Sequence, residues 1–167
     1  MASGNTLLTW TPQCNEPPAT IAATLDRRNY HPVLDFDPSA DEEAVFSDVM
    51  PRNYAGGGVT LYVHFTTDAT SGDAVWQAAF ERIGDGQQDI DADGFASFNS
   101  SGAVAVPATS GHVKICTITF TDGAQMDNVA VGEGFRLKVR RDADNTSATD
   151  SVTGNDLELR FLELKET

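Results

Sequence analysis

A chain of 167 residues is long enough for one domain with a sizeable hydrophobic core. Its 25 acidic and 11 basic residues give a net charge of −14, which argues against nucleic acid or an anionic membrane as a partner, because like charges repel. The two cysteines imply no disulfide framework, no stretch approaches the roughly 18 apolar residues of a membrane span, and the N-terminus lacks a signal-peptide pattern. We therefore expect a protein that is made in the cytosol and not exported by the signal-peptide route.

The first 19 residues are predicted to form an extended arm or edge, followed by a single domain over residues 20–167. Prolines at positions 12, 17 and 18 disfavour a helix and interior strand pairing. Leu7, Leu8 and Trp10 form an apolar patch on this arm, and such a patch usually buries against another surface. Its own domain is the favoured surface, and a neighbouring copy is the alternative.

The segment Thr20–Phe36 is predicted to be a strand or a bent strand. His31-Pro32 enforces an extended backbone, whereas the run TIAATLDRR leaves two helical turns as the alternative. Residues 35–43 are rich in acids, which indicates capping or a solvated loop, with a divalent cation as the sharper alternative. Three glycines at 56–58 predict a tight entry into the next strand; with no helix after them, they do not form a phosphate-binding loop.

The stretch Gly58–Ile83 contains two apolar runs joined by a linker rich in Thr, Asp, Ser and Gly. In the first run, apolar residues alternate with polar ones, as in a strand with one buried face: Val59, Leu61, Val63 and Phe65. The second run, around Trp76, is apolar on both faces. We predict that the two runs pair as an antiparallel hairpin at the centre of a sheet.

An acidic loop follows the second run. Asp89, Asp91 and Asp93 match the first half of an EF-hand loop, in which alternate carboxylates converge on calcium. Position twelve of that register holds a serine instead of the bidentate glutamate, so a turn with solvated aspartates is favoured and calcium is the alternative. Ile90 and Phe95 are expected to tuck this loop onto the core.

Two further patterns concern the C-terminal half. In HVKICTITFT the apolar phase changes from Val113 and Ile115 to Ile118 and Phe120, which predicts a β-bulge near Cys116 or Thr117, with Cys116 buried as a small hydrophobe. The segments 135–140 and 157–161 both alternate cleanly and are predicted to pair as a terminal hairpin. In this pattern Leu157, Leu159 and Phe161 share the buried face.

Nine or ten short strands without a long helix predict an all-β antiparallel sandwich, with a jelly roll as the leading architecture. The three histidines form no spaced metal motif, and no nucleophile is paired with a base. Carboxylate pairs such as Glu81 with a loop aspartate are expected by chance in so acidic a chain. We therefore expect no enzymatic activity and no cofactor other than the calcium alternative.

Four runs together resemble small structural proteins of tailed bacteriophages: TLDRRNYHPVLDFD, EEAVFSDVMPRNYAGGGVTLYVHF, WQAAFERIGDGQQDIDADGF and GFRLKVRRDADN. The resemblance implies a β-sandwich or jelly-roll module, often trimeric, that decorates and cements the capsid or forms a short fibre. It implies location on the virion, the major capsid protein as partner, and a homo-oligomer, most simply a trimer. It brings no active-site residues with it.

The expected interface combines the arm with outward-facing aromatic and histidine side chains, and the six candidates are Leu7, Leu8, Trp10, Tyr54, Tyr62 and His64. Ordinary sheet surface is the alternative role for the last three. Deletion of residues 1–18 is expected to leave a folded domain and to weaken attachment to the capsid. The alternative function is a receptor- or glycan-binding module of a tail or head fibre, assisted by calcium at Asp89, Asp91 and Asp93.

Overall fold

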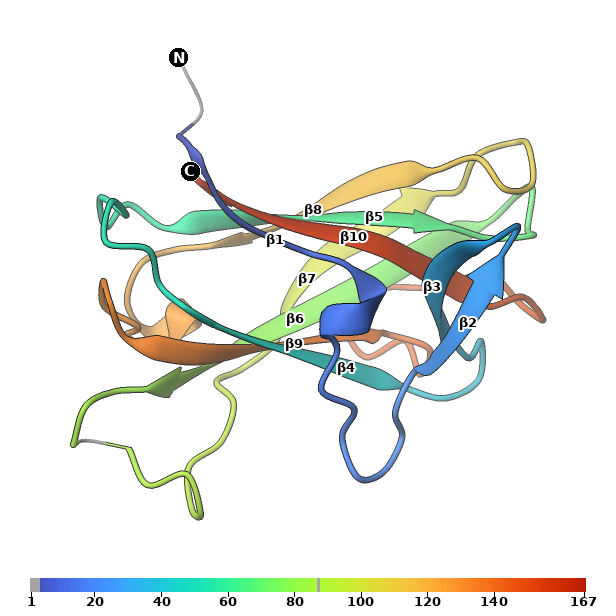
Figure 1. Ribbon diagram of the computed structural model, residues 1–167. Coiled ribbons are helices and arrows are strands. Elements are labelled where there is room, and N and C mark those ends of the chain that lie inside the picture. Colours follow the sequence, from blue (N-terminus) through green and yellow to red (C-terminus); the bar gives the residue numbers. More distant parts are fainter. Residues whose placement is uncertain (1–3, 87) are drawn as a thin grey trace.

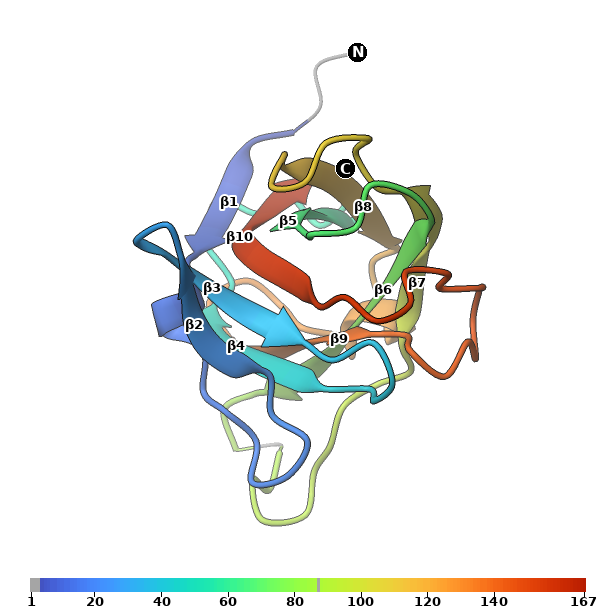
Figure 2. The same cartoon turned by 90° about the vertical axis from the view of Figure 1, so that its right-hand side faces the viewer.

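The computed structural model describes residues 4–86 and 88–167, and its strands form two antiparallel sheets packed face to face (Figures 1 and 2). The six-stranded sheet contains β1 (Thr6–Trp10), β2 (Thr24–Arg28), β3 (His31–Phe36), β5 (Val59–Thr66), β8 (Lys114–Phe120) and β10 (Leu157–Glu166). The four-stranded sheet contains β4 (Glu43–Val49), β6 (Asp73–Ile83), β7 (Asn99–Ala105) and β9 (Gly134–Arg141). Residues 1–3 of the expected arm and Gln87 of the acidic loop lie outside the described residues.

The order of the strands is that of a jelly roll. The six-stranded sheet runs β2-β3-β10-β5-β8, with β1 also paired to β10, and the four-stranded sheet runs β4-β9-β6-β7. The pairs β6·β7, β5·β8, β4·β9 and β3·β10 are the successive rungs of one long antiparallel ribbon, rolled so that its rungs fall alternately in the two sheets. The predicted all-β sandwich and its jelly-roll architecture are therefore confirmed.

The predicted hairpin across Gly58–Ile83 is wrong in its pairing, although both strands form. β5 pairs with β10 and β8, whereas β6 pairs with β9 and β7 in the other sheet. The connection, residues 67–72, links one sheet to the other across about 10 Å, whereas the turn of a hairpin joins neighbouring strands of one sheet. The predicted terminal hairpin is wrong for the same reason, because β9 and β10 belong to different sheets.

The segment predicted as one bent strand forms a hairpin of two strands, β2 and β3. Asn29 and Tyr30 make the turn with φ angles of 45° and 68°, the left-handed conformation that a two-residue hairpin loop of the primed type requires. The helical alternative is not realised, and in the described part of the chain the helices are two 3-10 turns, Pro12–Cys14 and Ala124–Met126. No helix within residues 4–86 and 88–167 is long and apolar enough to span a membrane.

Aromatic rings fill the core between the sheets. Phe36 and Phe65 pack against Trp76 with ring centroids 4.9 and 5.5 Å away, and Phe80 meets Phe120 edge to face at 4.9 Å. All five side chains are fully buried. These contacts join strands of both sheets, so the core holds the two layers together.

The N-terminal arm is extended and lies against its own domain. β1 pairs with the C-terminal half of β10, so that Thr6 lies opposite Lys165 (Figure 1). Trp10 is 4% exposed, with its ring centroid 6.1 Å from that of Phe46 and 6.3 Å from that of Phe135. Leu7 and Leu8 are half-buried and pack against the same core. Trp10 is therefore a core residue of its own copy.

A buried arginine ties the end of the sandwich to the loop between β9 and β10. Arg141 follows the inward phase of β9, and its side chain is 0% exposed. It donates two hydrogen bonds to Asp150, whose side chain is 2% exposed, and others to the carbonyls of Asn155, Val152 and Phe36. One side chain thus satisfies several acceptors of a long loop that would otherwise be buried without partners.

Candidate functional site

The middle of the outer face of the four-stranded sheet, along β9, is covered by its own chain. The Phe95 ring lies 5.0 Å from Arg136 Cζ and 4.5 Å from Lys138 Nζ, and the Phe98 ring lies 4.1 Å from Arg140 Cζ. The three cations, all on β9, also form ion pairs, with Glu81, Glu43 and Asp41 respectively. Aromatic rings and ion pairs therefore cover this face.

The acidic loop after β6 is packed differently from the prediction. Ile90, expected to tuck onto the core, is 72% exposed in a loop that projects from the sandwich (Figures 1 and 2). Phe95 is half-buried, but on the outer face of the sheet and not in the core. The cations of β9 provide a surface on which an aromatic ring packs well, and this explains why Phe95 is held outside.

The outer face of the six-stranded sheet carries an exposed apolar row. Phe161, His64 and Ile115 are cross-strand neighbours on β10, β5 and β8, and we refer to these three residues as the apolar row. Phe161 and Ile115 are 41% and 49% exposed, and the rings of Phe161 and His64 meet edge to face at 6.0 Å. Burial lowers the pKa of His64 below its usual value, so the row is uncharged at neutral pH. Val113 extends the apolar surface beyond Ile115.

A β-bulge creates one end of this row. The pairing of β10 with β5 shifts between Leu159 and Phe161, and Arg160 is the additional residue. Leu159 and Leu162 point into the core, so Arg160 and Phe161 both lie on the outer face, with Arg160 Cζ 4.2 Å from the Phe161 ring centroid. The predicted inward position of Phe161 is wrong because strict alternation does not survive a bulge.

Ile115, at the other end of the row, was expected in the core because a bulge was predicted in β8. The register of β8 against β5 is unbroken from Lys114 to Phe120, so the predicted bulge near Cys116 is wrong. Ile115 consequently points outward, while Cys116 is buried and its pKa is raised to about 12 by desolvation. The apolar phase change in the sequence marks an apolar outer surface at the start of β8, and it is the signal that could have revealed the row.

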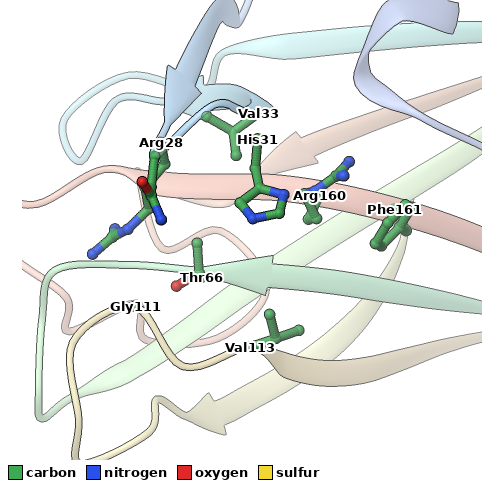
Figure 3. A pocket seen from close by; sticks show the side chains of 9 residues that line it. Arg28, His31, Val33, Thr66, Gly111, Val113, Arg160 and Phe161 are labelled. Atoms are coloured by element: carbon green, nitrogen blue, oxygen red, sulfur yellow. The ribbon is translucent and has the colours of Figure 1, made fainter.

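A groove of about 450 Å³ adjoins the row (Figure 3). The β2–β3 turn with His31 forms one wall, and Gly111 and Val113 form the other. The floor comes from outward-facing side chains of β3, β5 and β10: Val33, Thr66, Arg160 and Phe161. The volume is in the range of small-ligand sites, about 300–1,000 Å³.

Arg28 closes one end of the groove and holds its walls together. From β2 it donates hydrogen bonds to Glu158 on β10 at 2.8 and 3.0 Å, and to Asp68 and Ser110 in two different loops at 2.7 and 3.1 Å. The side-chain hydrogen bond to Glu158 is the largest influence on Arg28 and raises its pKa. A Cβ on Gly111 would lie 3.2 Å from Arg28 Nη2, so glycine allows this close approach. Arg28 thereby connects β2, β10 and two loops, all far apart in sequence, around the groove.

Two polar groups of the groove residues are buried without a hydrogen-bond partner among the described residues. Thr66 is 5% exposed, and its Oγ1 has no hydrogen-bond partner among the described residues. Arg160 Nη1 is likewise buried and unpaired. Buried polar groups are nearly always hydrogen-bonded, so these two are notable in the floor of a groove.

The structure places the six expected interface residues in three environments. Trp10 and Tyr54 are buried; Tyr54 Oη accepts a hydrogen bond from the Gly58 amide at 2.9 Å and donates one to Asp122 at 3.2 Å. Leu7 and Leu8 are half-buried at the sheet edge, as described above. Tyr62 and His64 lie on the outer face of β5, where His64 belongs to the apolar row and Tyr62 lies beside it. Phe161 and Ile115 are the residues of this face that the sequence interpretation missed.

The aspartates of the EF-hand-like loop bond to their own turn. Asp89 accepts a hydrogen bond from the amide of Asp91 at 3.0 Å, and Asp93 accepts one from the amide of Gly94 at 2.9 Å. All three aspartates are exposed. Such contacts are how aspartates stabilise turns.

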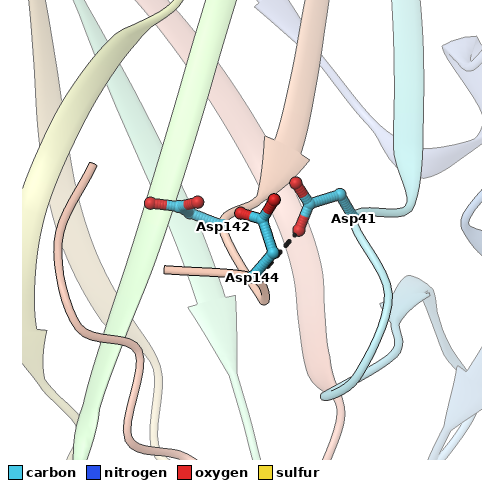
Figure 4. A group of neighbouring side chains, drawn as sticks. All are labelled: Asp41, Asp142 and Asp144. Atoms are coloured by element: carbon cyan, nitrogen blue, oxygen red, sulfur yellow. Dashed lines mark hydrogen bonds between the residues drawn. The ribbon is translucent and has the colours of Figure 1, made fainter. Parts of the chain in front are cut away.

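The carboxylates that converge, among the residues described, are others: Asp41, Asp142 and Asp144, each with an oxygen within 4.8 Å of the other two (Figure 4). Asp142 is buried, and burial alone would raise its pKa. Hydrogen bonds from the side chains and amides of Ser147 and Thr146 outweigh burial and hold its pKa well below its usual range. Asp41 accepts hydrogen bonds from the Asp144 amide at 3.1 Å and pairs with a β9 arginine. These contacts organise the loop after β9.

No family model and no curated protein matches the chain. Among solved structures it is similar to the CBM22-1 xylan-binding domain of Paenibacillus barcinonensis Xyn10C, with 14% identity, a TM-score of 0.40, and coverage of 100% of this chain and 99% of that one. It is also similar to infectious bursal disease virus Gx strain (7% identity, TM-score 0.35, 99% and 33% covered). A third is SCLam, a non-specific endo-beta-1,3(4)-glucanase from family GH16 (10%, 0.25, 99% and 93%). With scores this low, function is inferred below from the chain's own residues.

Proposed function

We propose that this chain is a non-enzymatic binding module that attaches to a larger assembly through the outer face of its six-stranded sheet. The observation that carries the proposal is the apolar row, which is exposed and uncharged on a chain of net charge −14. Contiguous exposed apolar surface rimmed by polar residues is a mark of an interaction site. The opposite sheet covers its own outer face with Phe95 and Phe98, so the two faces of the sandwich differ in what they offer.

The assembly that fits best is a virion, with the chain as a decoration or cement protein on the outer surface of a tailed-phage head. The resemblance of four sequence runs to such proteins supports this proposal, as does a rigid jelly roll with an aromatic core. The partner is then the major capsid protein, and a trimer of the chain is the favoured oligomer. Because Trp10 lies in its own core, the attachment surface is assigned to the sheet face and not to the arm.

Charge complements this attachment. Glu163 is the cross-strand neighbour of Tyr62, directly beside the row. Toward the other end, Glu158 is paired with Arg28, so Glu163 is the acidic group that a partner meets. An apolar centre with this acidic group at its rim suits a partner surface with an apolar patch and a basic residue beside it. Binding should therefore weaken as salt is raised, since rim charges are screened.

The test is attachment of purified protein to capsid shells assembled from the major capsid protein alone, measured by co-sedimentation. The double substitution Ile115→Ser and Phe161→Ser should lower apparent affinity about tenfold or more, because apolar anchors at an interface centre dominate binding. Val49→Ser, at an exposed apolar position of β4 in the other sheet, is the matched control and should bind as the parent does. Thermal unfolding checks that both variants fold. Unchanged affinity of the double variant would overturn the proposal.

A receptor- or glycan-binding module is the second candidate. The observation that favours it is the groove beside the row, whose lining combines an aromatic ring, aliphatic side chains and several hydrogen-bond donors. Binding sites for small polar ligands have this mixture. Binding of the intact protein to host cells, and not to shells, would favour this function over the first.

A further inference from the structure

The groove is lined by basic and not by acidic residues, although the chain as a whole is acidic. Acidic residues outnumber basic ones by 25 to 11 overall, yet the nine residues that line the groove include two arginines and a histidine and no acid: Arg28, Asn29, His31, Val33, Thr66, Gly111, Val113, Arg160 and Phe161. Figure 3 shows the His31 ring between Thr66 and Arg160. Arg28 is already paired with Glu158 and Asp68, so Arg160 is the lining arginine whose charge no described carboxylate offsets, and it favours an anion in that place.

Arg28 and Arg160 differ in what they have left to offer. Arg28 is already bonded to Glu158 and Asp68, so it shapes the groove. Arg160 has its guanidinium over the Phe161 ring, makes no ion pair with any described residue, and has a buried Nη1 without a hydrogen-bond partner. A guanidinium that packs on an aromatic ring and has no carboxylate partner can donate hydrogen bonds to the carboxylate of a ligand.

The remaining surface suits a ring with both hydroxyl groups and carbon–hydrogen faces. Val33, Val113 and Phe161 supply apolar contact, while Asn29 and His31 supply polar groups at the rim. Thr66 Oγ1, buried and unpaired in the floor, offers one more hydrogen-bonding group if a ligand reorients it.

We propose that the groove binds an acidic saccharide, a sugar ring that carries a carboxylate, with the carboxylate on Arg160 and the ring against Phe161 and Val113. This inference deepens the second candidate function and rests on it. The groove shares Phe161 with the apolar row, whereas Ile115 and His64 do not line it, so substitution of Ile115 tests attachment separately from sugar binding.

The experiment is titration of the intact protein with D-glucuronic acid and N-acetylneuraminic acid at pH 7 and low salt, followed by NMR. At least one acidic sugar should bind about tenfold more tightly than D-glucose and more tightly than acetate, which carries the charge without the ring. Arg160→Gln should weaken that binding about tenfold or more, since it removes the charged fork. Arg52→Gln, an exposed arginine outside the groove, is the matched control and should leave it unchanged.

Several results would overturn the proposal. These are no saturable binding by either acidic sugar up to about 10 mM, equal binding of glucose or acetate, or parent-like binding by a folded Arg160→Gln variant. Ile115→Ser separates this site from the attachment face: it should retain sugar binding while it loses affinity for shells. Loss of both activities in each single variant would show one shared surface and contradict the assignment of two sites.

Discussion

The buried pair Arg141–Asp150 should be one of the largest single contributors to stability outside the aromatic core. The perturbation is Arg141→Met, which keeps the length of the side chain and removes its charge and donors. Asp150 is then left as an ionised carboxylate whose side chain is 2% exposed, and the carbonyls of Phe36, Val152 and Asn155 lose a donor. Breaking one side of a buried ion pair costs about 3–5 kcal/mol, a large part of the roughly 5–15 kcal/mol that stabilises a domain.

The assay is urea unfolding followed by tryptophan fluorescence. Trp76 and Trp10 are both buried in the core, so their emission reports the loss of packing. The double substitution Arg141→Met and Asp150→Leu should be less destabilising than the sum of the two single changes, because it leaves no unpaired charge. A loss below about 1 kcal/mol for Arg141→Met, or strict additivity in the double variant, would refute this reasoning.

Two other predictions concern the buried carboxyl group of Asp35 and the N-terminal arm. Burial, together with the nearby charges of Glu158 and Asp26, raises the pKa of Asp35 to about 6. Between about pH 4 and pH 6 the folded state therefore keeps a proton that the unfolded state has released. The free energy of unfolding falls as pH rises through that window. Asp35→Asn should therefore raise the free energy of unfolding by about 1 kcal/mol at pH 7, after allowance for solvent screening, and change nothing near pH 3; equal effects at both pH values in urea titrations would contradict the cause. Deletion of residues 1–18, expected from the sequence to leave a folded domain, should instead lower stability by about 3 kcal/mol or more, because it removes β1 and takes Trp10 out of the core. An unchanged urea midpoint would show that the arm contributes nothing to the fold.

The sequence was sufficient for the class of fold because period-two alternation is a local property. In β5 and β9 it identified the inward residues correctly, Val59 and Leu61 and then Phe135 and Leu137 among them. Pairing could not be read in the same way, since β5 and β6 follow one another in the chain but lie in different sheets. A jelly roll pairs most of its strands with distant partners, and alternation says nothing about distance along the chain.

The candidate site was missed because alternation in the sequence does not reveal which strand contains a bulge. Alternation assigns apolar residues to the core, so Ile115 and Phe161 were placed inside, and both lie on the outer face. The bulge at Arg160 and the absence of one in β8 depend on how each strand meets its neighbour. The groove is less predictable still, because Arg28, Thr66 and Gly111 come from three separate segments that only the folded sheet brings together.

Amide hydrogen exchange of the protein, free and bound to capsid shells, would show which face attaches. We expect binding to slow exchange in β8 and in the 108–113 loop that leads into it, where the outer face of the six-stranded sheet meets its edge, and to leave the 84–98 loop on the other face unchanged. Protection confined to the 84–98 loop, or none in β8 when the shells are saturated, would contradict attachment through the apolar row.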